Sequence, residues 1–252
     1  MAVECRASYQ PGPEPSAPVD VAERALSAVR DLCGPWAATI AASLAVQPAA
    51  PIVVTVVGGA GVCRTRGTHI VLPLNDDGSG VLAGLAHELV HAVAGQSPNR
   101  LFDEGLAVQV DSELRLAGPA WPYYYLSPHR WMEVFREEGW RVTLPELIAS
   151  GEGRSLAEDR SSVRRRAVHY LHAASLCRHL RDALDPDEFW ARYRSGRLLP
   201  EGGDVGALER EWFLSIEHPL MADELLQRDR SFAVRTYSAA RREVNGRGVQ
   251  AR

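Results

Sequence analysis

The chain has no long apolar run and few cysteines. No segment reaches the roughly 18 consecutive apolar residues that a transmembrane helix requires, and the N-terminus has no basic segment followed by an apolar stretch, so it does not resemble a signal peptide. The four cysteines, which are Cys5, Cys33, Cys63 and Cys177, are scattered and form no CxxC pair. Scattered cysteines favour free thiols in a reducing compartment. We therefore expect a cytoplasmic protein without a membrane span.

An excess of charge of one sign is also missing. Arginine and lysine number 28 against 32 acidic residues, which gives a net charge of −4. This balance gives no electrostatic reason to expect binding to nucleic acid or to an anionic membrane. The run Arg164 to Arg166 is interpreted as a solvated helix face. A hydrophobic fraction of 46% with 24% charged residues is ordinary for a soluble globular protein.

The pattern along the chain predicts an α+β fold. Residues 1–18 contain four prolines and few large apolar residues, so we expect a flexible leader. Residues 19–252 are predicted to form one domain, with a small α/β lobe over 19–80 that holds a short mixed sheet and a mainly helical lobe over 81–242. Strands are expected at 51–57 and 68–73, and an ordered loop at 119–130. Helices are expected at 19–44 with a break at Gly34-Pro35, and at 81–95, 101–116, 143–150, 163–184, 186–195, 204–217 and 220–242.

The helix over 81–95 contains His87-Glu88-Leu89-Val90-His91. Residues four apart on a helix lie one turn above each other, roughly 6 Å between Cβ atoms, so both imidazoles can bind one tetrahedral zinc at about 2.0–2.1 Å. Glu88 follows His87 and can reach the water that zinc activates, as a general base. Leu85 and Leu89 make the helix partly buried, and buried histidines and carboxylates are costly unless something such as a metal satisfies them.

A third ligand is predicted in the next helix. The short HExxHxxGxxH pattern is excluded, because Ala94 and Ser97 stand at its last two positions. Twelve residues separate His91 from Glu104, enough for a helix end, a turn and an antiparallel return. We therefore expect one Zn²⁺ per chain, held by His87, His91 and Glu104, although another divalent metal would also suit these ligands.

The HELVH segment followed by Asp-Glu-Gly-Leu-Ala resembles the gluzincin metallopeptidases, in particular the short peptidase-MA-like members, and the resemblance is firm over about residues 69–110. It implies a thermolysin-like catalytic domain with the HExxH helix at the junction of the two lobes. It also implies that His87, His91 and Glu104 are ligands, Glu88 is the catalytic base, and Tyr170 donates to the oxyanion. The strand His69–Pro73 resembles the edge strand of this family that pairs with a peptide substrate. Substrate contacts are expected from His69, Ile70, Val71, Leu72 and, in the aromatic loop, Tyr124 and His129.

Several alternatives stay open. Tyr170 has the spacing of a core aromatic, and a residue of the 121–130 loop could replace it as oxyanion donor. His169 and His172 are three apart, but without a further ligand nearby they are expected to be hydrogen-bonded or surface histidines. The leading hypothesis is hydrolysis of a peptide or small amide substrate. One alternative is a metal-dependent tailoring enzyme that acts on a small molecule or a modified peptide in a biosynthetic pathway, in a small closed cavity. Another is a non-catalytic binding module, against which the presence of Glu88 argues. The oligomeric state is not predicted.

Overall fold

The computed structural model describes residues 3–12, 17–78, 80–116, 127–137, 139, 141–152 and 163–216. Its contacts divide the chain into two compact units. The first unit holds the chain up to Gln96, with the end of helix α3 (Arg100–Leu114) from Glu113 onwards. The second holds Ser97–Ser112 and the later helices.

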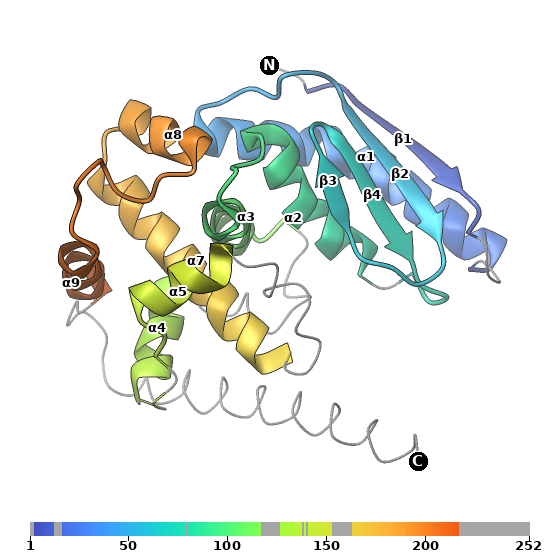
Figure 1. The fold of residues 1–252 in the computed structure, drawn as a ribbon. Helices are drawn as coiled ribbons and strands as arrows, with labels where there is room; N and C mark the ends of the chain where they lie inside the picture. Colours follow the sequence, from blue (N-terminus) through green and yellow to red (C-terminus); the bar gives the residue numbers. More distant parts are fainter. Residues whose placement is uncertain are drawn as a thin grey trace, which may run out of the picture. The chain divides into compact units, whose positions relative to one another are not determined.

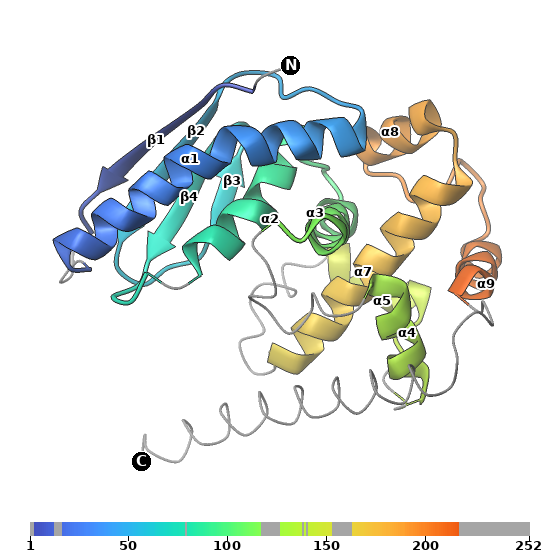
Figure 2. The same cartoon turned by 180° about the vertical axis from the view of Figure 1, so that it is seen from behind.

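The first unit is a four-stranded sheet with two helices on one face (Figures 1 and 2). The strand order is β1-β2-β4-β3, in which β1, β2 and β4 are parallel and β3 is antiparallel to β4. The helices are α1 and α2, which pack on each other and on the strands. The bounds are β1 Cys5–Gln10, α1 Val19–Leu44, β2 Ile52–Gly58, β3 Arg64–Arg66, β4 His69–Leu74 and α2 Val81–Ala94.

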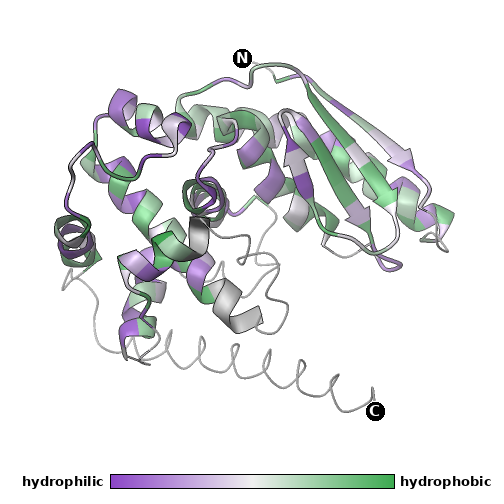
Figure 3. Ribbon diagram, in the orientation of Figure 1, coloured by the Kyte–Doolittle hydropathy of each residue, from purple (hydrophilic) through white to green (hydrophobic). Residues whose placement is uncertain are grey.

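Alternating side chains of the inner strands build the core of this unit. Every second residue of β2 and β4 is fully buried, and Figure 3 shows both strands as predominantly hydrophobic. Burial of one such side chain contributes about 1.5–3 kcal/mol. Because α2 packs on α1 and β4, it belongs to the first unit. The sequence pattern predicted instead that residues from 81 onwards belong to the helical lobe. The buried strand residues are Ile52, Val54, Val56, Ile70, Leu72 and Leu74.

The expected flexible leader is wrong for residues 5–10. This segment is β1, which runs parallel to β2 with Cys5 opposite Ile52 and Gln10 opposite Val57. Its hydrogen bonds come from the backbone, so a segment with few large apolar residues can still complete a sheet. A disulfide joins Cys5 to Cys33 of α1, and the expectation of free thiols is therefore wrong for these two cysteines. Cys63 and Cys177 are free.

Helix α1 continues through Gly34-Pro35, where a break was expected. Proline removes one N–H and leaves the carbonyl four residues earlier without its helical partner. Here both Pro35 and Asp31 are exposed, so water can satisfy that carbonyl. The opposite face of the helix is held by buried Cys33, Ala37 and Ile40, and this packing keeps the helix in one piece.

The second unit is helical. Helix α7 packs against α4, α5, α8 and α9, around buried aromatic side chains that include Trp131, Phe135 and Trp212. Helix α4 begins at Pro128, inside the segment expected to be a loop. The helix expected at 220–242 lies outside the described residues, and so do the side chains of Arg164 to Arg166. The bounds are α4 Pro128–Glu137, α5 Leu144–Glu152, α7 Val163–Ala183, α8 Pro186–Ser195 and α9 Val205–Ile216.

The predicted α+β class is confirmed: a small mixed sheet near the N-terminus is followed by a mainly helical region. Within the part of the chain that the structure describes, no helix has the length and apolar character needed to cross a bilayer.

Candidate metal centre

Helix α2 presents two histidines and a glutamate from the first unit. Leu85 and Leu89 are fully buried and fix the helix on the sheet. His87 is half-buried, and His91 and Glu88 are each 5% exposed. The helix thus holds three polar side chains at its buried or half-buried positions, as the sequence pattern predicted.

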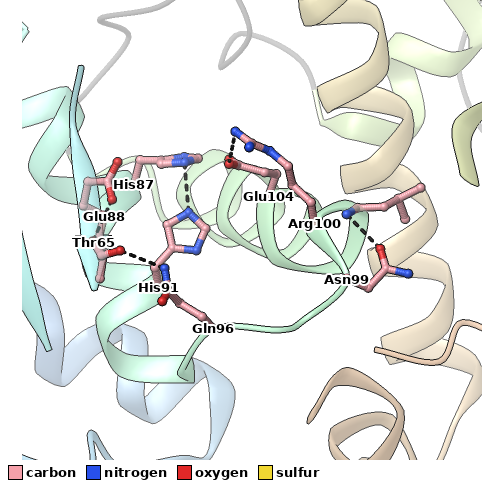
Figure 4. Close-up of polar contacts among 9 residues, drawn as sticks. Thr65, His87, Glu88, His91, Gln96, Asn99, Arg100 and Glu104 are labelled. Atoms are coloured by element: carbon pink, nitrogen blue, oxygen red, sulfur yellow. Dashed lines mark hydrogen bonds and ion pairs between the residues drawn. The ribbon is translucent and has the colours of Figure 1, made fainter. Parts of the chain in front are cut away.

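The two imidazoles of α2 point toward each other (Figure 4). Their Nε2 atoms are 3.3 Å apart, and the rings meet at 77°. Two nitrogen ligands at the tetrahedral angle around zinc are separated by about 3.3 Å, given Zn–N bonds of about 2.0–2.1 Å. The spacing of these two nitrogens therefore suits a shared metal ion without any change of rotamer.

Glu88 has a hydrogen-bond partner on the edge strand β3. The Thr65 hydroxyl donates to Glu88 Oε2 at 2.6 Å, and the Thr65 carbonyl accepts from Nε2 of Gln96 at 2.8 Å (Figure 4). Neither Thr65 nor Gln96 is among the residues predicted from the sequence. The available signal was weak: a polar residue at the inward position of the short segment Arg64-Thr65-Arg66.

Glu104 lies on α3 in the second unit, one turn after Arg100. Nη2 of Arg100 is 3.4 Å from Oε1 of Glu104, whose side chain is 15% exposed. Burial lowers the pKa of Arg100, but the charge of Glu104 and a hydrogen bond with Tyr170 outweigh it and hold this pKa above its ordinary value. Tyr170 therefore lies beside Arg100, the ion-pair partner of Glu104. Arg100 is not among the residues predicted from the sequence, although its spacing of four from Glu104 is typical of an ion pair on a helix.

The start of α3 is fixed by polar contacts within the second unit. The Asn99 side chain accepts from the Leu101 N–H at 3.0 Å, as an N-terminal cap does. Asp103 accepts from the Ser97 N–H and from the Tyr193 hydroxyl, at 3.2 and 3.1 Å. Burial and the nearby Asp103 carboxylate raise the pKa of Tyr193, so its hydroxyl stays protonated and donates. Glu104 therefore extends from a well-anchored helical turn.

Among the described residues, His87, His91 and Glu104 are a group of side chains that could hold a metal ion. Two imidazoles and one carboxylate are a donor set that zinc binds in hydrolases. The residues present therefore fit the ion that the sequence predicted.

The prediction that His69–Pro73 is an edge strand is wrong. β4 pairs with β2 on one side and β3 on the other, so its backbone is not an open edge. Ile70 and Leu72 are fully buried in the sheet core, and His69 bonds Thr55 through Nε2 at 3.0 Å. The edge beside α2 is β3, because the hairpin that returns through Gly67 places Arg64–Arg66 outside β4.

Of the two substrate contacts predicted in the aromatic loop, the structure describes His129. Nδ1 of His129 lies 2.7 Å from Oγ of Ser175, and the same Oγ accepts a hydrogen bond from Nε1 of Trp212 at 3.0 Å. Burial, with the charges of Arg178 and His179, lowers the pKa of His129 to about 4. This histidine is neutral at pH 7 and joins three helices of the second unit; its role as a substrate contact stays a prediction. Tyr124 lies outside the described residues.

His172 is hydrogen-bonded, as expected for a histidine that is not a ligand. Its Nδ1 lies 2.7 Å from the Val168 carbonyl, and its Nε2 accepts from the Val142 N–H at 3.1 Å. Both ring nitrogens are therefore occupied, which leaves none for a second metal.

Comparisons with known proteins found no match to a family model, a curated protein or a solved structure.

Proposed function

We propose that this protein is a zinc-dependent hydrolase of the gluzincin kind that cleaves an amide or peptide bond. The observation that carries the proposal is the pair of Nε2 atoms of His87 and His91, 3.3 Å apart, on the helix that also holds buried Glu88. The grouping of these histidines with Glu104 supports a third ligand.

The chemistry divides between the ion and the side chains. Zinc, when bound, would act as a Lewis acid that polarises the substrate carbonyl and makes a water more acidic. Glu88 would accept the proton of the attacking water and pass it to the leaving amine. Because Thr65 occupies Oε2, Oε1 is the oxygen assigned to this proton. Tyr170, which bonds Arg100 beside Glu104, would donate to the oxyanion.

Two carboxylate variants test these assignments. Glu104→Ala should bind zinc much more weakly, because it loses a ligand. Glu88→Gln should keep about one zinc per chain but lose about 10²–10⁴-fold in kcat, because a glutamine cannot accept the proton. Metal analysis and isothermal titration with zinc measure the first effect. Assays with quenched fluorescent peptides and small acyl amides measure the second.

The proposal fails if the wild-type protein neither retains nor takes up zinc. Equal zinc loss in the two variants would mean that the carboxylates are assigned wrongly. Full turnover by Glu88→Gln would remove the base from the mechanism.

A tailoring enzyme that acts on a small amide is a second candidate, and Gln96 favours it. A peptide that adds a strand to a sheet edge uses the outward-facing backbone groups of that edge. On β3 the carbonyl of Thr65 already accepts from Gln96, so an extended peptide would have to displace this side chain. Cleavage of small acyl amides without cleavage of any longer peptide would favour this candidate. A binding module is disfavoured because Glu88 is buried and oriented, which binding alone does not require.

A further inference from the structure

Thr65 is the middle residue of β3 and the one residue of that strand that is buried. Arg64 and Arg66 on either side are exposed, whereas Thr65 is 9% exposed and faces α2. Its hydroxyl oxygen lies 2.6 Å from Oε2 of Glu88 and 3.2 Å from the backbone carbonyl of Glu88. A hydroxyl donates one proton at a time, and the shorter contact to a carboxylate has the length of a charge-assisted bond, about 2.5–2.7 Å.

The position of this hydroxyl is fixed from two sides. Thr65 pairs with Ile70 in the ladder between β3 and β4, and Ile70 is fully buried. On its other side, the carbonyl of Thr65 accepts from Gln96, which lies two residues after the end of α2. The hydroxyl is therefore held against the helix that carries Glu88.

Glu88 needs such a partner. A glutamate side chain has three rotatable bonds, and a base must be held within about 0.5 Å of its productive position. Its carboxylate is buried, and a buried carboxylate without hydrogen bonds is unstable in the charged form that a base requires. A donor on Oε2 meets both needs, because it orients the group and stabilises the charge.

We propose that Thr65 is a positioning residue that orients the Glu88 carboxylate for proton abstraction. This inference rests on the proposed hydrolase function. It assigns to the edge strand a task in catalysis that is separate from binding a substrate backbone.

Three variants separate orientation from packing. Thr65→Val keeps the shape but has no hydroxyl, whereas Thr65→Ser keeps the hydroxyl. Thr55→Val makes the same change on the exposed face of β2, where Oγ1 bonds His69 instead. Each purified protein is loaded with Co²⁺ and titrated with acetohydroxamate, a small chelator whose hydroxyl would bond Glu88. The visible absorption of the cobalt reports both metal stoichiometry and chelator affinity.

Thr65→Val should retain one cobalt per chain and the wild-type melting temperature, yet bind acetohydroxamate about 10-fold more weakly, in line with loss of a hydrogen bond to a charged group. Glu88→Gln should show a similar or larger loss. The affinity of Thr65→Ser for acetohydroxamate should return to within about threefold of the wild-type affinity. The affinity of Thr55→Val should equal that of the wild type.

Different failures have different meanings. A wild-type protein that binds no cobalt overturns the proposed function and this inference with it. Wild-type affinity for acetohydroxamate in a cobalt-loaded Thr65→Val variant overturns the positioning role alone. Equal losses of melting temperature and affinity in the valine and serine variants would show that Thr65 serves packing only, which also overturns it.

Discussion

Gly105 lies next to the proposed ligand Glu104, where α3 packs on α7. A methyl group at this position would lie 2.6 Å from the carbonyl oxygen of Ala173 and 2.7 Å from Sγ of Cys177. Both distances are far below van der Waals contact, and the first atom belongs to a helix backbone that cannot move aside. Burial raises the pKa of Cys177, which therefore packs as a neutral thiol. The glycine of the Glu-Gly-Leu-Ala segment is thus required by the close approach of two helices.

We predict that Gly105→Ala destabilises the second unit by about 1–3 kcal/mol, as overpacking does. Gly206→Ala on α9 is the matched control, because a methyl group there meets only side-chain atoms of Asp204 and Arg210 at 3.3 and 3.4 Å. The control should be neutral or slightly stabilising, since alanine favours a helix. Denaturant unfolding followed by helical circular dichroism measures both. Equal stability of the two variants would contradict the close approach of α3 and α7.

At the scale of elements, β1 depends on a covalent link as well as on hydrogen bonds. It pairs with β2 on one side only, and it is a sheet edge. Its Cys5 is bonded to Cys33, a fully buried residue of α1. The link closes a loop over a sequence separation of 28 residues. By restricting the unfolded chain, a loop of this size stabilises the fold by roughly 3–4 kcal/mol.

Cys5→Ser should therefore lower the free energy of unfolding of the first unit by roughly 3–4 kcal/mol. Urea unfolding of the oxidised proteins gives the difference. Treatment with dithiothreitol should lower the stability of the wild type to that of the variant and leave the variant unchanged. A wild-type protein that is insensitive to the reductant would show that the disulfide does not contribute.

At the scale of the whole molecule, the second unit contains neutral histidines in its interior. Burial is the main cause that lowers the pKa of His129 and His172 to about 4, and it also lowers the pKa of His179. His172 is 1% exposed and stacks on Phe135. Protonation of these rings would place positive charge in a helical core, which couples the stability of this unit to pH.

We predict that this unit loses stability as the pH falls from about 6.5 to 4. In the unfolded chain a histidine takes up its proton near pH 6.5, whereas the folded unit resists protonation down to about pH 4. The free energy of unfolding therefore has its full value above about pH 6.5. Between pH 6.5 and 4 it falls by roughly 3 kcal/mol for each of His129 and His172. Urea unfolding across this range measures the slope. His172→Gln should remove part of this slope, and equal slopes in the wild type and the variant would contradict the assignment.

Local spacing determined much of the candidate site. His87 and His91 face each other because residues four apart share a helix face, and this follows from helix geometry alone. The β-branched run of β2 and the apolar stripe of α2 likewise predicted their elements. The Glu104 segment was identified by its motif, and Arg100 lies one turn before Glu104 on the same helix. Tyr170 interacts with Arg100 but belongs to α7, far along the chain from α3, so only packing shows this interaction.

Tertiary structure alone decided which strands are edges and what surrounds Glu88. β1 has few large apolar residues and β3 has three residues in all, so neither carries a strong local signal. Each becomes a strand because a neighbour supplies hydrogen bonds: β2 for β1, and β4 for β3. This pairing makes Arg64–Arg66 the sheet edge beside α2, in place of the predicted His69–Pro73, and it brings Thr65 to Glu88. Helical contacts are local and can be read from spacing, whereas sheet contacts join distant segments and are fixed only when the chain folds.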